Sequence, residues 1–132
     1  MSRSIIETTL ADHETLIRFR EGETLFHEGE EPKGVYVLHS GTVKLLFAGR
    51  NGNTKALREA RPGQLLGLSS VVSRRAHDCS ATAAEPCEVA FIEPDDFRRA
   101  LDDSPAVWFS VLRVLSNEVN AVYDDMRVMA AR

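Results

Sequence analysis

The feature that most constrains this chain is a change of residue pattern near position 94. Before that point, short strand-like runs of apolar and β-branched residues alternate with turn signals. After it, the apolar residues follow helical spacing to the end of the chain. Many short strands at such spacing predict a sandwich, barrel or jelly roll. The chain is therefore expected to have a β part followed by a helical part.

Turn residues punctuate the β part at short intervals. Glu21-Gly22, Ser40-Gly41 and Arg61-Pro62-Gly63 each separate two strand-like runs. The segment Arg50-Asn51-Gly52-Asn53 places Asn-Gly between two such runs, which is the strongest short hairpin signal. The expected strands are Leu16–Phe19, Thr24–Glu28, Val35–Leu38, Thr42–Phe47, Thr54–Ala60, Ser80–Ala84 and Cys87–Ile92.

Two helices are expected in the second part. Pro94 suits a first helical turn, and Asp95 and Asp96 favour the positive end of the helix dipole. This first helix is expected to stop near residue 103. Ser104 is then the predicted N-cap of a second helix that has Pro105 at its first position.

An apolar stripe runs along the second helix to the end of the chain. Its members are spaced alternately four and three residues apart, as in the a and d positions of a heptad. The first turns, where Phe109 and Val111 are also apolar, are expected to pack on the sheet. The later part predicts a dimer coiled coil, and a helix packed wholly on its own domain is the alternative. The stripe comprises Trp108 and the expected dimer-interface residues Leu112, Leu115, Val119, Val122, Met126 and Met129.

Length and composition exclude several classes of protein. The 132 residues suit one domain with one core. No apolar run approaches the ~20 residues that cross a bilayer, and the first residues lack a signal-peptide pattern. A cytoplasmic protein without membrane contact is expected. A net charge of −4 and a pI of about 5.6 argue against nucleic-acid binding by this chain alone.

Three stretches together resemble the cyclic nucleotide-binding domain family, in its Crp/Fnr regulator branch. Phe19–Glu30 is similar to the family's opening strands with their Gly-Glu turns, and Val35–Leu45 to its Tyr-containing hairpin. Pro62–Gly67 is similar to the family's entry to a phosphate-binding cassette. Cys87–Ala90 and the helical tail complete a resemblance that covers about residues 14 to 132.

The resemblance implies a mainly β fold with helices. This fold is a double-stranded β-helix (jelly roll) followed by a long C-terminal dimerisation helix. Residues 1–103 would form the β-roll sensor domain and residues 104–132 the dimerisation helix. In this family a short helix and loop hold the cyclic phosphate, a Glu accepts the ribose 2′-hydroxyl, and an Arg pairs with the phosphate.

The cassette implied by the resemblance spans Gly67 to Ala83, and it departs from the family pattern at two positions. The Glu position holds Leu68, and the Arg position holds His77, a weaker and pH-dependent cation. Cyclic AMP and a different small effector therefore both stay open, and no cofactor is assigned. The implied ligand-binding residues are Gly67, Leu68, Ser69, Ser70, Arg74, Arg75, His77, Asp78 and Ser80.

Metal, haem and catalytic sites are not predicted. His77 and Cys79 are too few ligands for a closed zinc site, and haem is disfavoured because it needs an axial ligand and a large apolar pocket. The chain has no nucleophile elbow, Walker motif or His-Glu-x-x-His motif, so it is not expected to be an enzyme. A cupin-like enzyme is disfavoured because the four histidines form no metal-binding motif.

The resemblance implies a role in transcription regulation. The chain would be the effector-sensing domain of a Crp/Fnr-type regulator, with a homodimer formed through the last helix. DNA would be bound by a helix-turn-helix domain that is not in this chain. Because the chain ends at Arg132 inside the predicted helix, a truncated protein is expected. The alternative is a stand-alone dimeric interaction module with a degenerate nucleotide pocket.

Overall fold

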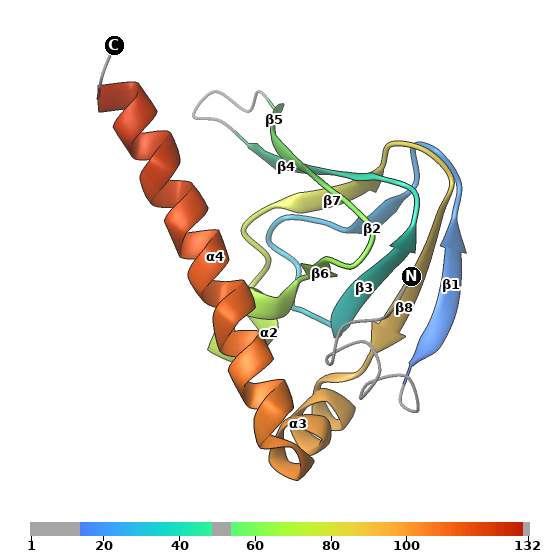
Figure 1. Cartoon of the computed structure of the whole chain (residues 1–132). Coiled ribbons are helices and arrows are strands. Elements are labelled where there is room, and N and C mark those ends of the chain that lie inside the picture. The colour runs from blue at the N-terminus through green and yellow to red at the C-terminus, as the bar shows by residue number, and fades with distance from the viewer. Residues whose placement is uncertain (1–13, 49–53, 131–132) are drawn as a thin grey trace.

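A computed structural model describes residues 14–48 and 54–130 of the chain (Figure 1). The β strands form two four-stranded sheets whose neighbouring strands pair antiparallel. This arrangement confirms the predicted β roll. One sheet has the order β1 (Thr15–Phe19), β8 (Cys87–Ile92), β3 (Val35–Ser40) and β6 (Leu65–Leu66), and the other has β2 (Thr24–Phe26), β7 (Ser80–Ala83), β4 (Val43–Ala48) and β5 (Thr54–Ala60).

Strand β3 is buried on both of its faces. Val35 and Val37 belong to a core cluster that also contains residues of the helices. Tyr36 and Leu38 point to the opposite face and belong to a second cluster made by both sheets. Because side chains alternate along a strand, one face of β3 meets the helices and the other meets the second sheet. The core therefore has two layers.

The turn between β3 and β4 requires glycine. Gly41 has a φ of +87°, a conformation that side chains with a Cβ adopt with strain. A Cβ at this position would also lie 2.7 Å from the Sγ of Cys87 and closer still to the carbonyl oxygen of Pro86. The expected Ser40-Gly41 turn is thus confirmed. The expected turn at Arg50–Asn53 lies outside the described residues, although the flanking strands β4 and β5 do pair.

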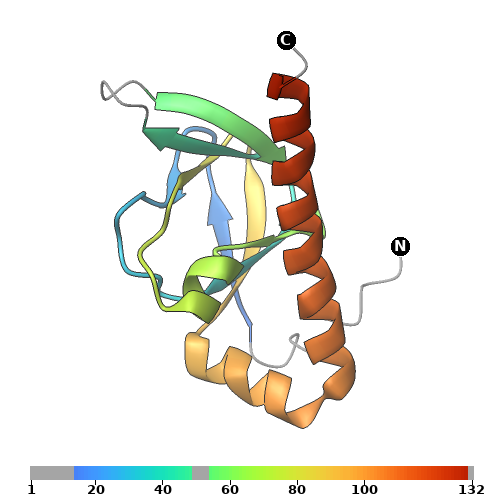
Figure 2. The same cartoon turned by 90° about the vertical axis from the view of Figure 1, so that its left-hand side faces the viewer.

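Within the described residues, the helices that accompany the sheets are α2 (Leu68–Ser73), α3 (Pro94–Asp103) and α4 (Pro105–Ala130). The predicted start of α4 is confirmed, because the backbone N–H of Val107 donates to the Oγ of Ser104 at 3.4 Å. Figures 1 and 2 show α4 running along one side of the β roll, with α3 across its lower end. Among the described residues, none of the helices is long and apolar enough to cross a membrane.

The first turns of α4 are anchored on the core. Val107 and Val111 are fully buried in the cluster that includes Phe97 of α3. The expectation that Phe109 packs on the sheet is wrong, because its side chain is 63 % exposed. Position 109 lies on the outer face of the helix, where the Arg113 guanidinium sits 5.5 Å from the ring centroid.

Candidate functional site

The cassette segment follows β6 and begins with a tight turn at Gly67, which leads into the short helix α2. Gly67 has a φ of +78° and stands at the N-cap position of α2. The helix ends at Arg74, a non-glycine residue in the left-handed conformation with φ 58° and ψ 43°. That conformation costs an L-residue about 1–2 kcal/mol. The backbone N–H groups of Arg74 and Arg75 both donate to the carbonyl oxygen of Ser70, which holds this strained end in place.

His77 lies in the interior of the cassette. Its backbone N–H donates to the carbonyl of Glu30 at 2.9 Å, and its carbonyl accepts from the N–H of Gly29 at 2.8 Å. The imidazole is only 4 % exposed and stacks on Phe26, with 3.9 Å between the ring centroids. A Cβ on Gly67 would lie 3.1 Å from the Cε1 of His77. The ring therefore fills the space beside the start of α2.

Burial sets the charge of His77. Desolvation lowers the pKa of its imidazole, and the nearby carboxylates of Glu30 and Asp78 only partly oppose this effect. The side chain at the position of the family's phosphate-binding arginine is therefore neutral at pH 7. It cannot supply a fixed positive charge to a phosphate.

The Leu68 side chain is structural. It is 1 % exposed and belongs to the core cluster with Val71 and Phe97. A buried apolar side chain offers no acceptor to a ribose hydroxyl. The contact that the family's glutamate makes is therefore missing from this cassette.

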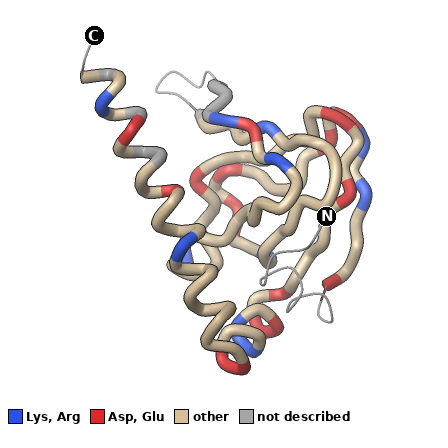
Figure 3. The backbone as a smooth tube through the Cα atoms, viewed as in Figure 1, with Lys and Arg blue, Asp and Glu red and all other residues tan. Residues whose placement is uncertain are grey.

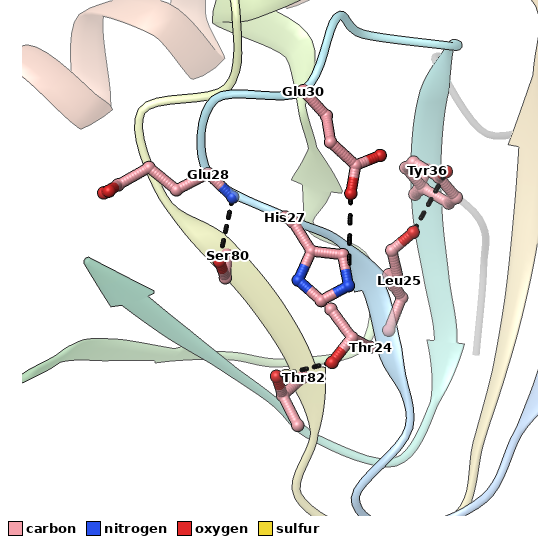
Figure 4. A network of polar contacts seen from close by, with 8 residues as sticks. All are labelled: Thr24, Leu25, His27, Glu28, Glu30, Tyr36, Ser80 and Thr82. Carbon is pink, nitrogen blue, oxygen red and sulfur yellow. Dashed lines mark hydrogen bonds and ion pairs between the residues drawn. The ribbon is translucent and has the colours of Figure 1, made fainter. Parts of the chain in front are cut away.

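The other predicted ligand residues differ in exposure. Ser70 is buried within α2, while Ser69 and Asp78 are exposed. Ser80 is half-buried, and its Oγ accepts from the backbone N–H of Glu28 at 2.8 Å (Figure 4). Thr24 and Thr82 lie 3.3 Å apart between their hydroxyl oxygens, so polar contacts join β2 to β7 along this edge (Figure 4). Ser80 thus has a partner within the roll.

A hollow of about 330 Å³ lies between the β roll and α4. The strands β4, β5 and β6 contribute one wall, and the helix contributes Val114, Asn117 and Glu118. None of the nine residues predicted for the ligand lines this hollow. The sequence carried no signal for it, because its walls come from distant segments. Its polar lining residues are Arg58, Glu59, Gln64, Asn117 and Glu118.

Acidic groups gather near this hollow. Burial first, and then the charges of Asp78, Glu28 and Glu118, raise the pKa of the Cys79 thiol to about 11. Burial also raises the pKa of Glu118, while Arg58 lowers it. The thiol is therefore protonated at pH 7 and is a poor nucleophile. Except beside Arg58, the acidic residues around this hollow favour a neutral or cationic ligand over an anionic one.

The arginines of the cassette face a different surface. Arg74 and Arg75 are exposed and line a hollow of about 470 Å³ together with Arg98 of α3. The structure thus brings Gly67 and His77 into contact. Arg74 and Arg75 do not line the hollow of about 330 Å³ that contains Glu118. Among the described residues, no three His, Cys, Asp or Glu side chains are placed to hold a metal ion.

Comparison with known proteins identifies the family to which this chain belongs. Residues 16–104, more than half of the chain, match the cyclic nucleotide-binding domain. The transcriptional activator protein Anr of Pseudomonas protegens is 30 % identical over 113 residues, which cover 83 % of this chain and 43 % of that protein. A lysophospholipase, NTE1 of Kluyveromyces lactis, is 27 % identical over 80 % of this chain but only 8 % of its own length.

A solved structure shares the fold of this chain. The Thermus thermophilus catabolite activator protein superposes with a TM-score of 0.85 at 21 % identity, over 96 % of this chain and 60 % of that chain. The chain spans less than half the length of the two curated relatives. The likeness to the lysophospholipase is confined to a small part of that enzyme and carries no enzyme activity to this chain. The chain belongs to the cyclic nucleotide-binding domain family, in the form found in Crp/Fnr-type regulators.

Proposed function

We propose that this chain is the effector-sensing domain of a cytoplasmic Crp/Fnr-type transcription regulator. The observation that carries the proposal is the hollow of about 330 Å³ that is walled jointly by the β roll and α4. This volume lies in the range of small-molecule sites. A ligand in it would touch Gln64 and Leu65 on one side and Asn117 and Glu118 on the other. Such a ligand would favour one position of the helix over another.

The transmission step rests on the two ends of α4. Its first turns are fixed to the core by Val107 and Val111, whereas Val119 and Met126 are exposed. A ligand that binds one helix position more tightly shifts the population toward it. We propose that this shift changes how two copies of α4 pair. The proposed dimer interface is Leu112, Leu115, Val119, Val122, Met126 and Met129, of which the side chains of Val122 and Met129 lie outside the described residues.

The residues of the proposed interface differ in their exposure along the stripe. Leu112, Val119 and Met126 are exposed and are available to a second copy. Leu115 is half-buried and packs partly against its own core cluster. We therefore propose the domain division at residues 1–103 and 104–132, with the start of α4 serving both parts.

The residues of the cassette do not fit a cyclic nucleotide held in the family's manner. Leu68 replaces the ribose acceptor, and the neutral ring of His77 replaces the phosphate-binding arginine. A lost hydrogen bond to a charged group costs about 1.5–3 kcal/mol. A small effector other than cyclic AMP or cyclic GMP, neutral or cationic beside Glu118, therefore fits these surroundings better.

DNA contact is proposed only through another domain. The chain has a net charge of −4, and Figure 3 shows Lys and Arg interspersed with Asp and Glu along the backbone. Such a mixture lacks the basic footprint that phosphates require. Pairing of two α4 helices would instead set the spacing of two recognition helices on a two-fold symmetric DNA site.

A second candidate is a stand-alone dimeric interaction module. The observation in its favour is that His77 and Leu68 fill the cassette with buried side chains. In that case α4 would pair without any effector. The two candidates differ in whether a small molecule stabilises the chain.

The test is thermal unfolding with cyclic AMP, cyclic GMP and a panel of nucleotides and metabolites. A ligand at 100 times its dissociation constant adds about 2.7 kcal/mol to the free energy of unfolding. A ligand that raises the Tm of the wild type should raise that of Glu118→Gln less, and that of the control Glu88→Gln equally. If cyclic AMP gave the largest rise, the assignment of a different effector would fail. If no compound raised the Tm, the interaction module would be favoured.

A further inference from the structure

An apolar groove lies outside the β roll, where α2 meets α3 and α4. It has a volume of about 340 Å³. Its floor is formed by buried core residues such as Leu101 and Val111. Val72, Trp108 and Leu112 form its rim and are each about half exposed. An exposed apolar surface of this shape marks a binding site more often than a scattered surface residue does.

A basic hollow adjoins this groove. The hollow of about 470 Å³ shares Val71, Arg74 and Arg98 with the groove and adds Arg75. Glu31 and Asp102 are the acidic residues that line the two hollows, so three arginines face two carboxylates. The two hollows together present an apolar trough with a basic end.

The arginines at this end differ in their partners. Arg98 donates to the carboxylate of Asp95 at 2.9 Å, which uses part of its charge. Within residues 14–48 and 54–130, the side chains of Arg74 and Arg75 take part in no hydrogen bond or ion pair. The backbone of Arg74 has the left-handed conformation, which glycine would adopt without strain but arginine adopts with strain. Strained residues of this kind cluster at ligand-binding sites.

We propose that this trough binds a small amphipathic carboxylate, with its carboxylate at Arg74 and Arg75 and its apolar tail along Val72 and Trp108. Guanidinium groups match the planar geometry of a carboxylate. The trough shares no lining residue with the hollow beside Glu118, so this site is separate from the proposed effector site.

Calorimetric titration of the chain with three probes tests the site. Decanoate carries both the charge and the tail, decanol carries only the tail, and acetate carries only the charge. Decanoate is expected to bind more tightly than either of the others. Equal affinities of decanoate and decanol would overturn the proposal, as would the absence of decanoate binding.

Two variants separate binding from folding. Arg74→Gly removes the charge and also relieves the backbone strain, so it should raise the Tm while weakening decanoate binding about threefold. Val72→Glu places a carboxylate at the exposed rim and should abolish decanoate binding with little change in Tm. The control Arg18→Gln, on β1, should leave binding unchanged. Unchanged binding by Arg74→Gly would contradict the proposal.

A second copy of the chain is the competing occupant, because Leu112 also belongs to the stripe proposed for the dimer. Sedimentation velocity of wild type and Val72→Glu distinguishes the two. The same sedimentation behaviour for both is expected. If Val72→Glu converted a dimer into a monomer, the groove would be an interface between copies and the carboxylate site would be overturned.

Discussion

The two halves of α4 have the same backbone and opposite surroundings. In the first half, Val107 and Val111 are 0 % and 1 % exposed within the core cluster. In the second half, Val119 and Met126 are 50 % and 58 % exposed. The fold of this chain explains why Val107 and Val111 are apolar, but it does not explain why Val119 and Met126 are apolar. One helix can therefore be anchored at one end and present a surface at the other.

The largest effect is expected from matched charged substitutions in the two halves. Val107→Asp buries an unpaired carboxylate and should lower the free energy of unfolding by about 3–5 kcal/mol. Val119→Asp changes an exposed position and should alter it by no more than about 0.5 kcal/mol. Urea unfolding of both variants provides the measurement. Similar losses in the two variants would show that the halves do not differ.

Leu115 marks the boundary between the halves. Because it is half-buried against the core, Leu115→Ala should cost about 1–2 kcal/mol, less than the 2–5 kcal/mol of a fully buried leucine. The neighbouring Leu112→Ala should cost under about 0.5 kcal/mol in the monomer. Urea unfolding at low protein concentration tests the pair. A larger loss for Leu112→Ala would move the boundary toward the start of the helix.

A smaller effect is expected at the anchored end. Ser104→Ala removes the Oγ that accepts from the N–H of Val107 and should cost about 1 kcal/mol. Ser104→Asp retains an acceptor and should keep most of the stability. Circular dichroism during thermal unfolding measures both variants. Equal stability of Ser104→Ala and wild type would mean that the packing of Val107 alone fixes the start of α4.

The smallest expected effect is a pH dependence of the free energy of unfolding, which should depend on His77 in the β roll and not on Val119 in α4. The pKa of His77 is lowered from 6.5 in the folded state, so below pH 6.5 the unfolded state binds more protons than the folded state. The free energy of unfolding should therefore fall as the pH is lowered from 7.5 to 5.5. His77→Gln should reduce this slope, whereas Val119→Asp should not lower it. An unchanged slope in His77→Gln would assign the pH dependence to other groups.

The sequence predicted the fold better than the site. Glycine turns and strand-like runs are local signals, so the strands and the Ser104 cap could be predicted from them. The substitutions at Leu68 and His77 were also visible in the sequence. The burial of their side chains was not, because Leu68 belongs to a core cluster with Phe97 of α3 and His77 stacks on Phe26 of β2.

The exposure of individual helical residues was harder to predict. Phe109 is as apolar as Val111, and only the docking angle of α4 decides that one is exposed and the other buried. The hollow beside Glu118 has the same origin, since β5 and α4 are far apart in the sequence. The dimer stripe itself stays a prediction.

The pairing of β1 with β8 has a consequence for how this chain acquires its structure. Thr15 lies opposite Phe91, so the first described strand finds its partner only after nearly the whole roll has been made. Contacts between residues so distant in the chain slow folding, because the intervening loop must be closed first. During synthesis at about 5–20 residues per second, β1 would wait several seconds for its partner. The helix that carries the proposed dimer surface emerges after that strand, so the roll can close before a second copy is met.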